Sequence, residues 1–129
     1  MTARKKRAAQ SAVLELTERA LADLREIERY SVKEWGRTTA DKYLDEIAAA
    51  LDRLRERPEI LRLEPDFARG LYFYRVKKRV LVCAWQGRRV IVLTVIHTSM
   101  DLPARLLELQ PRLAAEAEFL LSKLTEKSR

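Results

Sequence analysis

Residues 71–97 have the sequence LYFYRVKKRVLVCAWQGRRVIVLTVIH. They are rich in β-branched and aromatic residues, and two polar pairs, Lys77-Lys78 and Gly87-Arg88, interrupt them. This pattern predicts three strands in a tight antiparallel meander, over residues 71–76, 79–86 and 89–97. The runs 80–85 and 90–96 are almost continuously apolar, which is typical of strands that are covered on both faces.

The same region carries positive charge. From Phe67 to His97 there are seven basic residues and no acidic one, a sum that equals the formal net charge of +7 of the whole chain. Residues 1–11 add a basic arm with Arg4, Lys5, Lys6 and Arg7. One-signed charge favours an anionic partner, and a solvated basic rim is an equal alternative on charge alone.

Composition limits the classes of function. The chain has 129 residues, of which 47% are hydrophobic and 35% charged, and this fits one folded domain. Three glycines do not form a glycine-rich phosphate loop, and one His with one Cys gives no zinc-ligand spacing, so no cofactor or metal is expected. Cys83 lies in an apolar run, so we expect its thiol to be buried. A single cysteine cannot form a disulfide within the chain, which fits a reducing compartment. No apolar run is long enough for a membrane span, and we expect a cytoplasmic protein.

Two helices are predicted before the sheet, after a short apolar piece at residues 13–16 that resembles a strand. Thr17 is a candidate N-cap for the first helix, and Gly36 is suited to end it. Thr38 and Asp41 are expected to open the second helix. Because about three residues join the helices, they should pack as an antiparallel hairpin.

The C-terminal part is also helical in character. It divides into residues 102–109 and 111–124, and Pro111 suits the first turn of the second piece. The apolar residues of this piece are Leu113, Ala117, Leu120, Leu121 and Leu124. The helical hairpin can cover one face of the sheet, whereas a C-terminal helix, a partner protein, or both must cover the other. The predicted fold is therefore α+β, with an N-terminal short strand and a helical hairpin packed on an antiparallel β-sheet, and an added C-terminal helix.

Four runs resemble the ParE-type toxins of the RelE/ParE superfamily. They are LTERALADLREIERYSVKEWG (16–36), ADKYLDEIAAALDRL (40–54), GLYFYRV (70–76) and VIVLTVIHTSMDL (90–102). Their order and spacing, and the closing His97-x-x-Met100-Asp101, carry a resemblance over about residues 12–107. The expected division is a basic arm (1–11), a RelE/ParE-like toxin domain (12–110) and a C-terminal helical extension (111–129).

The resemblance implies a toxin of a bacterial or plasmid type II toxin–antitoxin system, with a role in growth arrest and stress response. Its partner would be a cognate ParD-like antitoxin, whose acidic or disordered C-terminal segment wraps the toxin and covers the apolar sheet face. ParE-like members are thought to inhibit DNA gyrase. RelE-like members are ribosome-dependent endoribonucleases that cleave mRNA. A binding module that has lost toxicity is the third alternative.

The residues after the last strand favour the gyrase inhibitor. RNA cleavage needs a base, an acid and cations around the phosphate. The nuclease branch tends to place a Tyr, or a His-Tyr pair, after the last strand, whereas here no aromatic residue follows His97 until Phe119. One reading of His97 is a general base. Because the ParE-like pattern carries a His there without known catalysis, the resemblance implies a structural histidine, hydrogen-bonded near the Asp101 turn, and we assign no catalytic residue.

The candidate contacts with target or antitoxin come from the basic region and the closing segment. They are Arg69, Arg75, Lys77, Lys78, Arg79, Arg88, Arg89, His97, Met100 and Asp101. Arg75 and Arg79 flank one two-residue turn, so both are expected to project near the same sheet edge. Trp35 and Trp85 are expected in the core.

Overall fold

The computed structural model describes residues 11–63, 70–98 and 102–127. The elements follow the order β1 (Val13–Leu16), α2 (Glu18–Trp35), α3 (Arg37–Glu56), the 3-10 turn η1 (Pro58–Ile60), β2 (Arg62–Leu63), β3 (Tyr72–Val76), β4 (Arg79–Gln86), β5 (Arg89–His97) and α4 (Leu102–Lys127). The predicted α+β order is confirmed.

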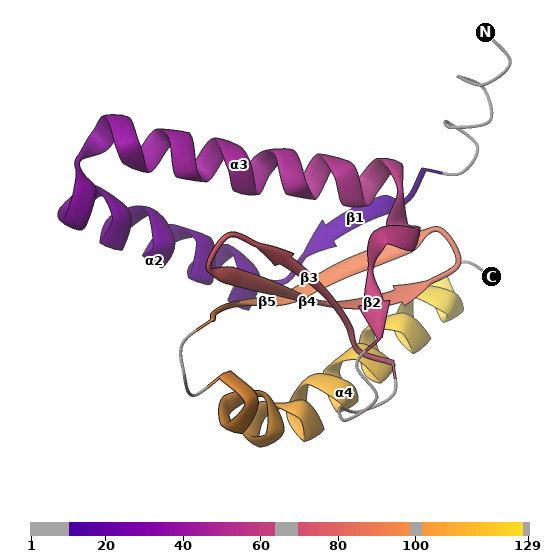
Figure 1. The fold of residues 1–129 in the computed structure, drawn as a ribbon. Coiled ribbons are helices and arrows are strands. Elements are labelled where there is room, and N and C mark those ends of the chain that lie inside the picture. Colours follow the sequence, from indigo (N-terminus) through magenta and orange to yellow (C-terminus); the bar gives the residue numbers. More distant parts are fainter. Residues whose placement is uncertain (1–10, 64–69, 99–101, 128–129) are drawn as a thin grey trace, which may run out of the picture.

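The strands form one five-stranded sheet in the order β1-β5-β4-β3-β2 (Figure 1). β1 is parallel to β5, and the other neighbours are antiparallel. The predicted strands at 79–86 and 89–97 are confirmed, and the first meander strand begins one residue later than expected, at Tyr72. β2 was not predicted, because two residues are too few to show a period-2 pattern.

Local hydrogen bonds explain how α2 begins and ends. The Thr17 hydroxyl accepts from the Ala20 amide at 3.0 Å and donates to the Leu93 carbonyl at 2.7 Å, so the cap also joins the helix to β5. Gly36 ends α2 with a φ of 86°, in the region that favours glycine. The expected linker of three residues is wrong. α3 begins at Arg37, because the Gly36 carbonyl already accepts from the Ala40 amide.

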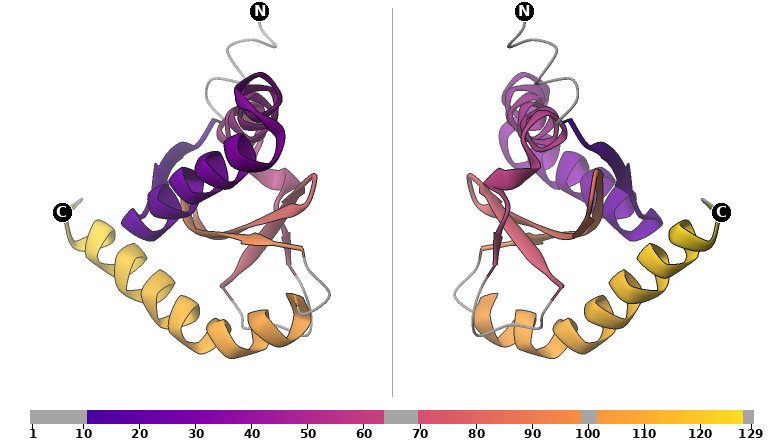
Figure 2. Two further views of the ribbon diagram at one scale, coloured as in Figure 1. Left: turned by 90° about the vertical axis from the view of Figure 1, so that its left-hand side faces the viewer. Right: turned by 90° about the vertical axis from the view of Figure 1, so that its right-hand side faces the viewer.

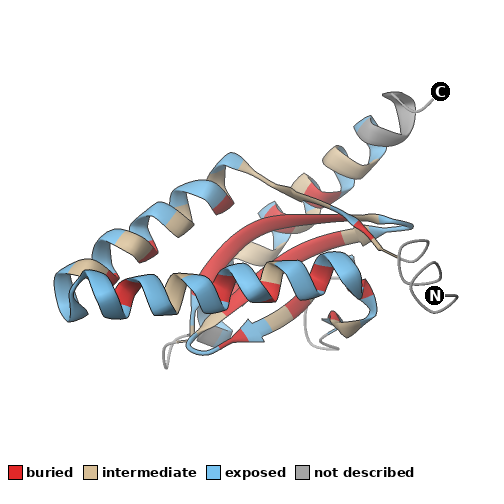
Figure 3. Cartoon of the chain, turned by 90° about the horizontal axis from the view of Figure 1, so that it is seen from above, coloured by how far each residue is buried: buried red, intermediate tan, exposed pale blue. Residues whose placement is uncertain are grey.

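Two apolar layers lie on the two faces of the sheet. The hairpin of α2 and α3 covers one face, and α4 covers the other (Figures 1 and 2). The hairpin-side layer contains Ile27, Ile47, Leu54, Leu81 and Val92, and the α4-side layer contains Phe73, Val82, Leu93, Leu106 and Leu113. Buried residues follow the central strands and the inward faces of the helices (Figure 3). The prediction that β4 and β5 are covered on both faces is confirmed.

The C-terminal segment is one helix, and Pro111 lies inside it rather than in a first turn. The expectation of two pieces is therefore wrong. Pro111 and Leu107 are both exposed, so water can reach the Leu107 carbonyl that the missing Pro111 N–H leaves without a helical partner. Arg19 of α2 and Glu116 of α4 form an ion pair at 2.8 Å, which joins this helix to the opposite layer. The sheet face that the resemblance assigned to an antitoxin segment is thus covered by α4.

The prediction that both tryptophans lie in the core is wrong for Trp35, whereas Trp85 packs against the hairpin-side layer. Trp35 is 51% exposed because it ends α2 at the tip of the hairpin, where the helix extends past the sheet. Trp85 is half-buried and makes an edge-to-face contact with Tyr72, with ring centroids 5.2 Å apart. Cys83 is buried as predicted, and burial raises the pKa of its thiol far above the usual range.

Within the described ranges, no helix combines the length and apolar character that a membrane span requires. The same residues contain no group of three or more His, Cys, Asp or Glu side chains placed to hold a metal ion.

Candidate functional site

The structure divides the predicted site residues among three places. Lys77, Lys78, Arg79 and His97 meet where the β3–β4 turn lies beside the end of β5. Arg88 and Arg89 lie at the opposite end of these strands, in the β4–β5 turn. Arg75 lines a different pocket from Arg79, and a shared contact surface for these two arginines stays a prediction. The remaining three, Arg69, Met100 and Asp101, lie outside the described residues.

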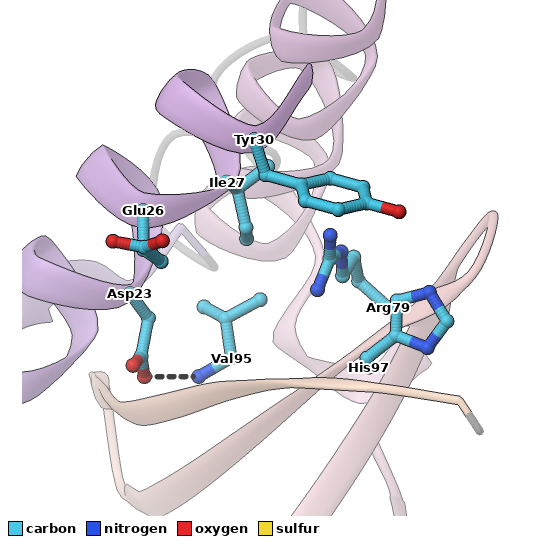
Figure 4. A pocket seen from close by; sticks show the side chains of 7 residues that line it. All are labelled: Asp23, Glu26, Ile27, Tyr30, Arg79, Val95 and His97. Atoms are coloured by element: carbon cyan, nitrogen blue, oxygen red, sulfur yellow. Dashed lines mark hydrogen bonds between the residues drawn. The ribbon is translucent and has the colours of Figure 1, made fainter. Parts of the chain in front are cut away.

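A groove opens between α2 and the end of β5, with a volume of about 410 Å³. We call it the hairpin groove; it is lined by Asp23, Glu26, Ile27, Tyr30, Arg79, Val95 and His97. Arg79 and His97 are cross-strand partners on β4 and β5. Their side chains lie together near the Tyr30 ring, whereas Asp23 turns toward the strand (Figure 4). The groove therefore has a basic and aromatic end and an acidic end.

A β-bulge directs His97 into this groove. Val82 pairs with Thr94 and Cys83 with Val92, so Leu93 is an extra residue on β5. Val92 before the bulge and Val95 after it both belong to the hairpin-side layer, which a regular alternation would not allow. Because the bulge shifts the alternation by one residue, His97 faces the hairpin instead of α4.

Asp23 of α2 holds the bulge in place. Its Oδ2 atom accepts hydrogen bonds from the Thr94 hydroxyl and, at 3.0 Å, from the Val95 amide. β1 ends at Leu16, opposite Val92, so the amide of Val95 finds its acceptor on a helix rather than on a neighbouring strand. Asp23 thus satisfies a donor that the sheet leaves open, and its carboxylate has a structural role.

His97 is exposed, and its pKa is lowered by partial loss of solvent and by the positive charges of Arg79 and Lys78. It is therefore neutral near pH 7, with a ring nitrogen able to accept a proton. Arg79 is fixed beside it, because its Nε donates to the Tyr43 hydroxyl at 3.2 Å. Asp101 is not among the described residues, so the expected hydrogen bond of His97 near the Asp101 turn stays a prediction.

Three aromatic rings pack edge to face at the tip of the hairpin. The Tyr30 and Trp35 ring centroids are 6.1 Å apart and those of Trp35 and Tyr43 are 6.0 Å apart, both with an edge-to-face angle of 86°. We call Tyr30, Trp35 and Tyr43 the aromatic cluster. Tyr30 and Trp35 are about half exposed, at 48% and 51%. The sequence did not predict this cluster. The spacing of apolar residues shows which face of a helix is apolar, but it does not show where the hairpin extends beyond the sheet and leaves that face exposed.

A second pocket of about 320 Å³ adjoins the aromatic cluster and carries positive charge. It is lined by Trp35, Thr39, Lys42, Tyr43, Glu46 and Lys77. Lys77 pairs with Glu46 at 3.6 Å and has a φ of 54°, a left-handed conformation that costs a side chain about 1–2 kcal/mol. Trp and Tyr are enriched at protein interfaces whereas Lys is depleted there, so the exposed aromatic cluster, and not the lysines, marks this surface as a candidate interface.

Arg88 and Arg89 make contacts within the chain. Arg89 pairs with Glu15 at 2.9 Å, and the Nε of Arg88 donates to the Ser11 carbonyl at 3.1 Å. Both contacts hold β1 against β5. A role for these two arginines in partner binding stays a prediction.

The sequence has relatives of known family. Residues 14–102 match the family described as the ParE toxin of the type II toxin-antitoxin system, parDE. The chain belongs to the ParE toxin family. It is 31% identical over 100 residues to Toxin ParE1 of Caulobacter vibrioides, an alignment that covers 70% of this chain and 94% of that protein. It is 29% identical over 92 residues to Toxin ParE of Escherichia coli, covering 70% of this chain and 89% of that protein.

A solved structure supports the ParE fold. A chain described as a chromosomal ParDE TA system from P. aeruginosa superposes with a TM-score of 0.61 and 18% identity, covering 70% of this chain and 99% of its own length. The family match ends at residue 102, the first residue of α4. The helix that covers the second sheet face is therefore an addition to the part of the chain that matches the family.

Proposed function

We propose that this ParE-type toxin is a cytoplasmic inhibitor of DNA gyrase and that a ParD-like antitoxin neutralises it. The observation that carries the proposal is the family match over residues 14–102. The ParE-like branch, which the sequence resembles, is thought to act on gyrase. Inhibition by binding needs no catalytic group, only a surface that fits the target.

The hairpin groove and the aromatic cluster are the surface that we assign to the target. Hot spots of protein interfaces are enriched in Trp, Tyr and Arg, and Trp35, Tyr30 and Arg79 lie together here. The edge-to-face contacts hold the rings in position before binding, which reduces the entropy lost on association. Truncation of a hot-spot residue at an interface commonly weakens binding by about 2–4 kcal/mol.

The antitoxin is assigned to the same basic end of the molecule. An acidic segment would meet Lys77, Lys78 and Arg79, and opposite charges would raise its association rate. By covering the hairpin groove, such a segment would exclude the target. Neutralisation and target binding would then compete for one surface.

Purified protein tests the gyrase proposal directly. We expect it to block supercoiling or to trap cleaved DNA, and the Trp35→Ala variant to need at least about tenfold more protein for the same effect. Phe119→Ala is the matched control, because Phe119 is an exposed aromatic residue on the outer side of α4, at 62% exposure. Equal potency of the two variants would remove the aromatic cluster from the target surface, and full gyrase activity at saturating toxin would refute the proposal.

A second candidate function rests on one observation. The hairpin groove brings together a neutral histidine, an arginine and a tyrosine, and this set contains a base, a cation and an acid for cleavage of RNA. The endoribonuclease alternative therefore needs its own test. Expression in growing cells, read separately for DNA damage response and mRNA integrity, distinguishes the two functions. Codon-linked mRNA cuts that His97→Ala abolishes would establish the nuclease, whereas intact mRNA with a DNA damage response supports the gyrase inhibitor.

A further inference from the structure

A second charged groove lies at the other edge of the sheet, with a volume of about 440 Å³. We call it the arginine groove; its lining residues are Arg53, Glu56, Arg57, Ile60, Arg62, Tyr74 and Arg75. β2 pairs only with Tyr72 and Phe73, so Tyr74 and Arg75 lie on a part of β3 that β2 does not cover. The groove is formed there between β3 and the C-terminal end of α3.

The groove contains four arginines and one glutamate. The arginines come from α3, from the residue that follows α3, from β2 and from β3. Arg57, Arg62 and Arg75 are exposed, and within the described part of the chain they form no ion pair. Arg53 is held in place, since its Nε donates to the Tyr74 hydroxyl at 3.1 Å and its guanidinium lies 5.9 Å from the ring centroid. Among the described residues, Glu56 is the one carboxylate in the lining, so the described part of the groove has an excess of positive charge.

We propose that the arginine groove binds the phosphodiester backbone of nucleic acid. A guanidinium presents two parallel N–H donors that match two phosphate oxygens, and several such groups along one edge suit a chain of repeated phosphates. The formal net charge of +7 adds a long-range attraction of the same sign. The groove supplies charge rather than groups that read base edges, so binding is insensitive to base sequence.

The lining favours nucleic acid over an acidic peptide. A peptide that adds to a sheet edge gains specificity from pockets for alternate side chains. Here Ile60 is the aliphatic member of the lining, and Arg53 already covers the Tyr74 ring. A phosphate backbone needs only the charges, and the release of its counterions supplies the binding free energy.

The inference goes beyond inhibition of gyrase and does not depend on it. The arginine groove and the hairpin groove have no lining residue in common. A toxin that holds DNA at one edge of its sheet would reach any DNA-bound target by local search rather than from bulk solution. Nucleic acid without gyrase is therefore enough to test the proposed binding.

The test uses the full chain, a short labelled DNA duplex, its single strand and the matching RNA, followed by fluorescence anisotropy between about 50 and 200 mM salt. The variant is Arg57→Gln with Arg62→Gln and Arg75→Gln. The control is Arg25→Gln with Arg105→Gln and Arg112→Gln, which removes the same charge from exposed positions on α2 and α4. Melting temperatures of both variants should equal that of the parent protein.

For duplex DNA we expect the groove variant to lose at least about tenfold in affinity and to lower the salt slope by roughly 2–3, since each phosphate contact contributes about 0.9. The control should keep the slope of the parent protein. Equal losses in both variants would show that net charge alone acts, and would overturn the proposal, as would unchanged binding in the groove variant. A glutamate-rich peptide is the competing ligand, and loss of peptide binding with intact DNA binding would also overturn it.

Discussion

Leu113 anchors α4 to the sheet, and its replacement by Ala tests how strongly the added helix stabilises the fold. The side chain is 2% exposed and belongs to the layer formed with Leu93, Val82 and Leu106. Leu→Ala in a core removes the transfer free energy of the lost carbons and leaves a cavity, for a total of about 2–5 kcal/mol. Since α4 is an outer layer that can move toward the sheet, we expect the lower part of this range, about 2–4 kcal/mol.

This loss should appear as a lower melting temperature. For a chain of this length, 1 kcal/mol corresponds to roughly 4 °C, so the Leu113→Ala variant should melt about 8–16 °C below the parent protein. The measurement is thermal unfolding by circular dichroism, supported by urea titration. The urea slope should be unchanged if the helix stays docked, because the surface exposed on unfolding is then the same.

Leu107→Ala is the matched control. It makes the same chemical change in the same helix, but Leu107 is 53% exposed, and an exposed substitution should stay within about 0.5 kcal/mol. A difference of less than a few degrees between the two variants would refute the packing of α4 described here.

Three further outcomes follow from named contacts. Asp23→Ala should destabilise the chain by about 1–3 kcal/mol in urea unfolding, because the Val95 amide loses its acceptor. In an NMR titration His97 should have a pKa below 6.5, and Arg79→Gln should raise it. Because the folded state binds this proton less readily than the unfolded one, the contribution of His97 to stability is present above pH 6.5 and is lost as pH falls toward the lowered pKa. Truncation after Gln110 removes the anchor of α4 and should lower the melting temperature or change the oligomeric state, and an unchanged protein would make the tail a passive extension.

Much of the fold could be predicted because it depends on local patterns. The two-residue turns set the ends of β4 and β5, and a continuous apolar run indicates a strand covered on both faces. The roles of Thr17 and Gly36 at the two ends of α2 could be predicted from the residue types alone, since a hydroxyl can cap a helix and a glycine can adopt a positive φ. The family resemblance, now confirmed by the match over residues 14–102, followed from the order of these elements.

The features that were missed depend on contacts between distant residues. The bulge at Leu93 has no local signature, and it needs the carboxylate of Asp23, 72 positions before Val95, to hold it. Pro111 predicts a helix start by local rules, yet packing on both sides of it keeps α4 continuous. The candidate site was predicted in part. The basic residues near the β3–β4 turn were identified, but the aromatic cluster beside them comes from the hairpin tip, which folding alone brings there.

The docking of α4 also bears on where an antitoxin can bind. A segment that took the α4-side face would first have to displace the helix and expose Leu106 and Leu113 again. That exposure would cost about 3–6 kcal/mol for the two leucines, with some chain entropy regained. The hairpin groove requires no such displacement, because it is open and carries Arg79 and the exposed Tyr30. An antitoxin of moderate affinity should therefore bind the hairpin groove and leave α4 in place, and protection of α4 amides from hydrogen exchange should be the same with and without it.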